Sequence, residues 1–115
     1  MKDWNAIQKR FLRDTLPTRL GGIAANLSRV KSFVASNANR EAVASLLEES
    51  KFFIEWTAGE ADIDTAAELV ELQVQLSLWQ QAWDEVWRDS AQREQLASAS
   101  GKWSQRVLEL SGLLG

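Results

Sequence analysis

One stretch of the chain, residues 64–88, limits its possible folds more than any other. Large apolar side chains recur in it at steps of three and four residues: Leu69, Leu72, Leu76, Trp79, Trp83 and Val86. This spacing places them on one side of an α-helix and does not fit a β-strand, whose side chains alternate between two faces. The stretch has no glycine or proline and is rich in residues that favour helices. We therefore predict one long helix over residues 64–88, with Leu76 and Trp79 buried in the core.

Three other stretches carry the same spacing, and each predicts a helix. The first stretch begins around Pro17, which suits a first helical turn, and ends at a turn over residues 36–39. Its row, which Leu16 extends backwards, is Leu16, Leu20, Ile23, Leu27, Val30 and Val34. After that turn, up to Gly59, the row is Val43, Leu47, Ser50, Ile54 and Thr57. The row after Asp89 and Ser90 is Leu96, Ala99, Trp103, Val107, Leu110 and Leu114.

A short additional helix is predicted over residues 4–14, with Asp3 as its N-cap. The four long helices are joined by short connections, which favour antiparallel neighbours. We therefore predict an all-α fold, an antiparallel up-down-up-down four-helix bundle with a short extra N-terminal helix. The chain of 115 residues has the size of a single domain, in which residues 1–16 form an N-terminal segment and residues 17–115 the four-helix core.

Two groups of small residues lie inside predicted helices. Gly21 and Gly22 either delay the start of their helix or let a neighbouring backbone come close, and we favour the first interpretation. The segment at residues 98–101, Ser-Ala-Ser-Gly, either permits close packing or loosens the last helix.

The long helix has a second apolar face, which is the main functional clue. At about 100° per residue, a second row points away from the first: Ile63, Ala67, Val70, Val74 and Leu78. An outer helix of a bundle is normally polar there, so another element is expected to cover this row. The N-terminal segment is one candidate, and a second copy of the chain, which we slightly favour, is the other.

Six tryptophans are many for this length. Trp79, Trp83 and Trp103 fall on core rows, whereas Trp56 and Trp87 fall at the edges of rows and are predicted to be half exposed. The candidate interaction surface therefore comprises Val70, Val74, Leu78 and Trp87.

Charge is unevenly distributed along the chain. Residues 1–40 hold eight cations and two acids, a net charge of +6, and the other 75 residues hold five cations and fourteen acids, a net charge of −9. Four cations on or beside one helix form a candidate phosphate-binding group: Arg19, Arg29, Lys31 and Arg40. The alternative is that this helix pairs with acidic helix faces that carry Glu48, Glu49, Glu55, Glu68 and Glu71. The sequence pI of about 5.0 favours the alternative, so nucleic acid is not the expected partner.

The residue types that are missing exclude several chemistries. Because the sequence contains no His, Cys or Tyr, the usual zinc, iron–sulfur and haem ligand sets cannot be assembled. Catalytic Ser-His-Asp and Cys-His groups are excluded for the same reason. No cofactor is expected, and no residue qualifies as catalytic.

Glu68 and Glu71 stand one helical turn apart, as two ligands of a magnesium ion would. This Glu-x-x-Glu pair, together with the earlier Glu48-Glu49 pair, resembles the motif of helical nucleotide pyrophosphohydrolases of the MazG type. The resemblance implies Mg²⁺-dependent nucleotide hydrolysis. The Glu-x-x-Asp that follows in that family is missing here, which removes the quartet of ligands, and we therefore expect Glu68 and Glu71 to lie on a solvated face.

The interpretation that fits these observations is a small non-enzymatic helical bundle that mediates protein–protein interaction or self-association. Magnesium-dependent nucleotide hydrolysis and nucleic-acid binding remain the alternatives. No apolar run is long enough to span a membrane, and the N-terminal residues lack the apolar core of a signal peptide. We therefore expect the chain in the cytoplasm, without a membrane partner.

Overall fold

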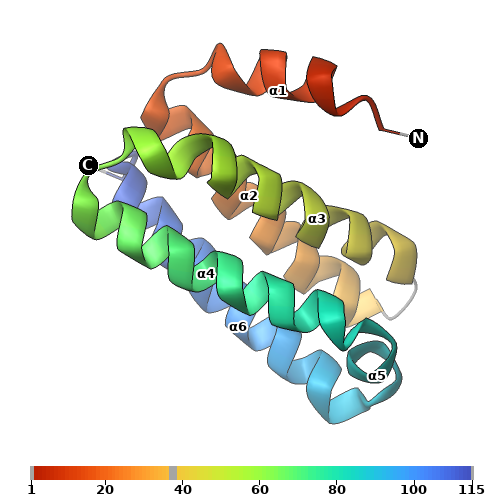
Figure 1. The fold of residues 1–115 in the computed structure, drawn as a ribbon. Helices are drawn as coiled ribbons and strands as arrows, with labels where there is room; N and C mark the ends of the chain where they lie inside the picture. The colour runs from red at the N-terminus through yellow and green to blue at the C-terminus, as the bar shows by residue number, and fades with distance from the viewer. Residues whose placement is uncertain (1, 37–38, 115) are drawn as a thin grey trace.

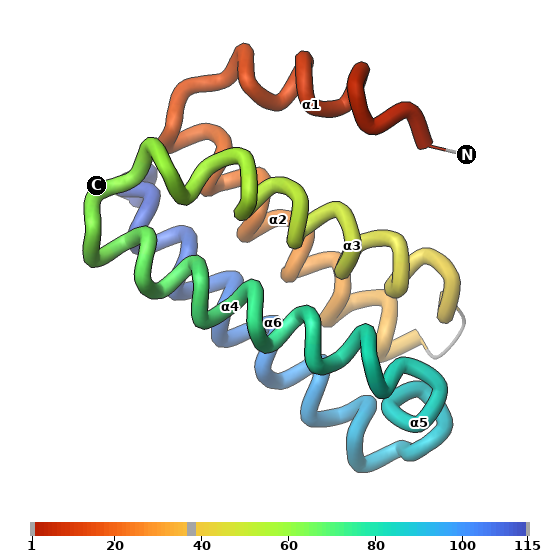
Figure 2. The backbone as a smooth tube through the Cα atoms, viewed as in Figure 1, coloured from red at the N-terminus to blue at the C-terminus, as the bar shows by residue number. Residues whose placement is uncertain are grey.

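The computed structural model of the chain describes residues 2–36 and 39–114. All regular structure in this part of the chain is helical, and it contains no strand (Figures 1 and 2). The elements are α1 (Trp4–Leu12), α2 (Leu16–Ser36), α3 (Arg40–Thr57), the 3₁₀ turn η1 (Ala58–Glu60), α4 (Ile63–Gln81), α5 (Trp83–Arg88) and α6 (Ser90–Ser111). The predicted all-α class is therefore confirmed. None of the described helices is long and apolar enough to cross a membrane.

The predicted starts of the first helices are confirmed in their main features. Asp3 caps α1, since its side chain accepts a hydrogen bond from the backbone N–H of Ala6 at 3.1 Å. α2 begins at Leu16, so that Pro17 occupies the first helical turn as expected. Residues 37 and 38 of the predicted turn between α2 and α3 lie outside the described residues, and α3 follows Asn39 at its N-cap position.

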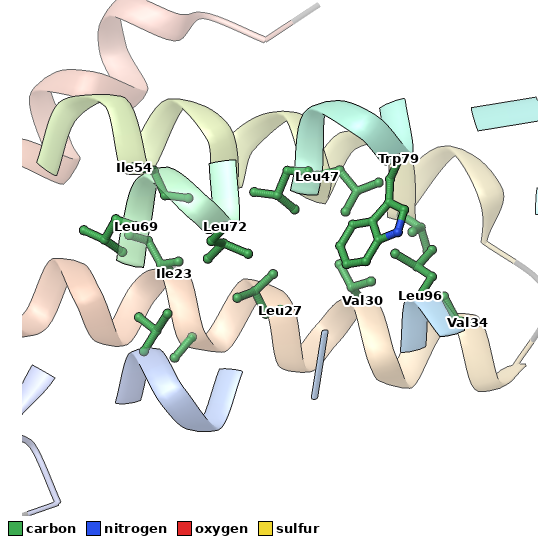
Figure 3. Close-up of a cluster of buried hydrophobic side chains, with 14 of the residues drawn as sticks. Ile23, Leu27, Val30, Val34, Leu47, Ile54, Leu69, Leu72, Trp79 and Leu96 are labelled. Atoms are coloured by element: carbon green, nitrogen blue, oxygen red, sulfur yellow. The ribbon is translucent and has the colours of Figure 1, made fainter. Parts of the chain in front are cut away.

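The predicted apolar rows of α2 and α3 form most of one side of the core. From Leu20 to Val34 every member of the α2 row is buried, and so is every member of the α3 row from Val43 to Thr57. α4 closes the core from the other side, with Leu69, Leu72 and Leu76 fully buried and Trp79 9% exposed. Figure 3 shows members of these rows meeting between the helices, among them Leu27, Leu47, Ile54, Leu69, Leu72 and Trp79. The predicted burial of Leu76 and Trp79 is thus confirmed.

The single long helix predicted over residues 64–88 is wrong, because the helix breaks at Ala82. Ala82 has φ −105° and ψ 26°, which is not helical, and no glycine or proline marks this position. Beyond the break, α5 coils across the end of α4 (Figure 1). This turn buries Val86 to 4% exposure and packs Trp83 and Trp87 against the core. Tertiary burial of these apolar side chains therefore overrides a local sequence that favours continuous helix.

α6 is rotated relative to the prediction. Its buried side chains are Leu96, Ser100, Val107 and Ser111, whereas Trp103 is half-buried and Leu114 is exposed. The rotation brings small residues of α6 against α2. The contact between α2 and α6 is the most extensive between two elements of the described chain. At this contact the hydroxyl of Ser104 donates a hydrogen bond of 2.7 Å to the carbonyl oxygen of Ala24. The segment at residues 98–101 therefore serves close packing within an unbroken helix.

Gly21 and Gly22 do not delay the start of α2, and the favoured interpretation of these residues is wrong. The helix already runs through them from Leu16. A Cβ atom on Gly21 would lie 2.9 Å from Cδ1 of Leu113, and one on Gly22 would lie 3.8 Å from the ring of Phe11. The neighbours of the two glycines are thus side chains from α1 and from the residues after α6.

Candidate functional site

The second apolar row of α4 lies on the surface of the protein. Val70 is 49% exposed, and Val74 and Leu78 are each 54% exposed. Their four-residue spacing stacks them one turn apart on one side of the helix. Ile63, at the start of α4, is 85% exposed and lies on the same side, as does exposed Ala67. These five residues, Ile63, Ala67, Val70, Val74 and Leu78, are called the α4 row below.

The N-terminal segment does not cover the α4 row. α1 instead lies along the outside of α3 (Figure 1), where the Trp4 ring is 4.4 Å from that of Phe52 and the Phe11 ring is 4.0 Å from that of Phe53. Trp56 contacts both ends of this aromatic cluster. The apolar side of α1 is thus committed to α3, and within the described residues the α4 row stays exposed.

Trp87, the fourth residue of the predicted surface, is not part of the row. It lies on α5 beyond the break, where its ring is 5.6 Å from that of Trp83 and packs against the core. The guanidinium of Arg93 lies 5.9 Å from the centre of the Trp87 ring. The structure therefore brings Val70, Val74 and Leu78 together and places Trp87 on α5, where it packs against the core.

A hollowed surface lies beside the α4 row, between α3 and α4. Two adjoining hollows of about 450 and 390 Å³ share Trp4, Glu48 and Gln80 in their linings. Glu41 and Trp83 also line the first hollow, and Phe52, Glu55 and Gln73 also line the second. We call this surface the α3–α4 groove. It was missed from the sequence, because Trp4 and Trp83 reach it only through the placement of α1 and the break at Ala82.

The surroundings of the α4 row are acidic on both sides. α4 itself carries Asp64, Glu68 and Glu71 and no cation. Asp64 and Glu71 are exposed on the side of the row away from the α3–α4 groove. On the groove side, α3 presents Glu41, Glu48 and Glu55, seven residues apart and all exposed. That spacing keeps the three carboxylates on one face of α3, a signal that the sequence alone contains.

Two cations also lie at the α3–α4 groove. The Nζ atom of Lys2 is 3.3 Å from a carboxylate oxygen of Glu49, which offsets its charge, and it lies 5.1 Å from the centre of the Trp4 ring. Lys51 is half-buried and lines the second hollow. Even with these cations, and with Arg106 of α6 paired with Glu68, acids predominate around the groove and the α4 row together.

Arg19, the first of the predicted phosphate-binding residues, is held in an ion pair. It is 5% exposed, and its Nη1 and Nη2 atoms donate to the carboxylate of Glu60 at 2.8 and 3.0 Å. Its Nε atom donates to the carbonyl oxygen of Asp14 at 3.1 Å. The hydrogen bonds between Arg19 and Glu60 raise the pKa of Arg19 and lower the pKa of Glu60 from its ordinary value. This pair links α2 to the turn before α4.

The structure does not gather the other three candidate cations around one position. Arg29 donates to the side chain of Asn26, which in turn donates to Glu49. The side chain of Lys31 passes over Gly101 of α6, and Arg40 forms an ion pair with Asp84 of α5. Arg19 and Arg40 therefore pair with acids as in the alternative interpretation, although Glu60 and Asp84 are not the acids named for it.

The two carboxylates of the Glu-x-x-Glu pair have different surroundings. Glu68 accepts two hydrogen bonds of 2.7 Å from Arg106, which lower the pKa of Glu68. Glu71 is exposed. Across residues 2–36 and 39–114, no group of three or more acidic side chains is close enough together to hold a metal ion.

No protein-family model matches the chain, and neither the curated proteins nor the solved structures include a significant match. The candidate site thus rests on the geometry and charge of α3, α4 and their neighbours.

Proposed function

We propose that this chain is a small non-enzymatic protein that binds another polypeptide through the α4 row, either a different protein or a second copy. The observation that carries the proposal is the exposure of Val70, Val74 and Leu78 on one side of a helix whose other side forms the core. Burying a large apolar side chain stabilises by roughly 1.5–3 kcal/mol, so a partner that covers the row gains a substantial contribution to binding.

The proposed architecture behind this surface is an antiparallel up-down-up-down four-helix bundle with α1 on its outside. The most extensive helix–helix contacts, between α2 and α6, between α2 and α3, and between α3 and α4, support this arrangement. The short connections between successive helices also support it. In Figure 2 the colours along the tube show the chain direction in each helix. In such a bundle each helix has one side available to solvent, and among the described residues the solvent side of α4 carries the exposed apolar row. We place the protein in the cytoplasm, in keeping with its lack of cysteine.

Site-specific photocrosslinking in cells of the source organism tests the proposal. A photoreactive amino acid replaces Val74 in the α4 row, and in a matched control it replaces exposed Gln105 of α6. We expect a discrete crosslinked protein from position 74 and none from position 105. The additional substitution Val70→Glu should abolish the product, because it places a charge in the apolar contact. Absence of any product specific to position 74 would overturn the proposal.

A further inference from the structure

We propose that the partner of the α4 row is a cationic amphipathic helix, with an apolar stripe that covers the row and Lys or Arg on both sides of that stripe. This inference rests on the proposed function and names the chemistry of the partner. It follows from the charges that border the row, from the aromatic lining of the α3–α4 groove and from the dimensions of the exposed helix face.

The charges around the α4 row are complementary to a cationic helix. The α4 row is bordered by exposed Asp64 and Glu71 on one side. On the other side it is bordered by the groove with Glu41, Glu48 and Glu55. Apart from half-buried Lys51 in the groove, the residues between these borders are neutral, so the surface is an apolar strip between two acidic margins. Complementary charges around an apolar contact set the register and favour the correct partner, which here means cations on both sides of the stripe.

The aromatic lining of the α3–α4 groove also suits long cationic side chains. Long Lys and Arg side chains can lay their aliphatic stems on apolar surface and keep their charges in water. Trp4, Phe52 and Trp83 supply such surface next to Glu48 and Glu41. The chain already shows this mode of contact, since the ammonium of Lys2 lies 5.1 Å from the centre of the Trp4 ring while it pairs with Glu49.

The length of the α4 row and the charge of α4 favour a separate basic helix over a second copy of the chain. From Ile63 to Leu78 the row extends about 22 Å at 1.5 Å per residue, a length that about four turns of a partner helix match. A second copy that pairs α4 with α4 would bring together two helices that each expose Asp64 and Glu71 and carry no cation, whereas Glu68 is paired with Arg106 of α6. Like charges at such a contact oppose association, so a basic helix fits this surface better than a second α4.

A pair of synthetic helical peptides tests the inference against the intact chain. The two peptides of about 18 residues share one apolar stripe, and Lys flanks the stripe in the first where Glu flanks it in the second. We expect the Lys peptide to bind at least 10-fold more tightly by calorimetry in low salt. Its affinity should fall several-fold when salt is raised, because screening weakens the contacts between exposed charges. Amide shifts on binding should centre on α4 and on the groove side of α3.

Matched variants locate the charges. Glu48→Gln combined with Glu55→Gln should weaken binding of the Lys peptide several-fold, whereas Glu94→Gln combined with Glu109→Gln on α6 should leave it unchanged. Val74→Ser should weaken binding of either peptide. All these positions are exposed, so circular dichroism should show unchanged helix content.

The outcomes separate this inference from the proposed function. Equal binding of both peptides would overturn the cationic partner and leave the α4 row as a binding surface. Failure of both peptides alongside a crosslink from position 74 would also overturn it and leave the proposed function standing. An intact chain that forms a dimer at micromolar concentration, and that Val74→Glu converts to a monomer, would show that the partner is a second copy and overturn the inference.

Discussion

The two sides of α4 carry similar residues in opposite environments. On the inner side Leu69, Leu72 and Leu76 are fully buried, and on the outer side Val74 and Leu78 are each 54% exposed. The same helix therefore contributes both to the core and to an apolar strip in contact with water. An apolar row on a helix therefore indicates that this face is buried by some partner. Only the positions of the neighbouring elements show whether that partner belongs to the same chain.

The largest expected effect comes from truncating the inner side. Leu76→Ala should lower the free energy of unfolding by about 2–5 kcal/mol, because it leaves a cavity in a packed core. The matched change on the outer side, Leu78→Ala, should cost less than about 1 kcal/mol, since half of that side chain is already in water. Urea unfolding measures both values. Equal losses would mean that the two sides of α4 do not differ as described.

A smaller effect on stability is expected from replacing a buried polar residue of α3. The hydroxyl of Ser50 in α3 is fully buried and has no hydrogen-bond partner among the described residues. Ser50→Ala should therefore stabilise the protein by about 1 kcal/mol, because an unpaired buried hydroxyl is costly and alanine favours helix. As a control, Ser104→Ala removes the hydrogen bond to Ala24 and should be destabilising. Urea unfolding distinguishes a gain from a loss.

A charge on the outer side should leave both the stability and the monomeric state of the chain unchanged. Val74→Glu should alter the free energy of unfolding by no more than about 0.5 kcal/mol, since this position is a half-exposed surface site. Sedimentation velocity should show that the intact chain and the variant are both monomers at high micromolar concentration, as expected if the proposed partner is a basic helix. A loss of several kcal/mol would place Val74 in contact with the core.

The smallest expected effect concerns the ion pairs that hold α4. Arg19 lowers the pKa of Glu60, just before α4, and Arg106 lowers the pKa of Glu68 within it, each from an ordinary value of 4.5. A carboxylate with a lowered pKa stabilises the folded state above its unfolded pKa, and this contribution is lost as pH falls through the folded pKa. Stability should therefore fall on acidification below about pH 4.5.

Two single variants, Glu60→Gln and Glu68→Gln, show which ion pair contributes more to the pH dependence of stability. Urea midpoints between pH 7 and pH 3 should depend less on pH in Glu60→Gln than in Glu68→Gln, because the partner of Glu60 is buried whereas Arg106 is about half exposed. Identical pH profiles for the intact chain and both variants would contradict a role for these pairs.

Apolar spacing predicted the core residues of α2 and α3 because each of these helices packs one continuous stripe against its neighbours. The same reasoning failed at Ala82, where the gain from burying Val86 depends on elements distant in sequence. It also failed in α6, where close approach to α2 favours buried Ser100 over the larger Trp103. The outer row of α4 could be predicted as apolar, but its exposure could not, since this depended on α1 packing against α3.

The hydrogen bond between Ser104 and Ala24 joins residues 80 positions apart in the sequence. The most extensive contact between two helices thus links α2 with α6, so its formation requires the closure of a very long loop. This gives the protein a high contact order for an all-helical chain, and it should fold more slowly than bundles held by sequential neighbours. During synthesis the apolar side of α2 stays without its main cover until residues 90–111 have left the ribosome. Nascent chains that lack α6 should therefore bind chaperones that recognise exposed apolar segments.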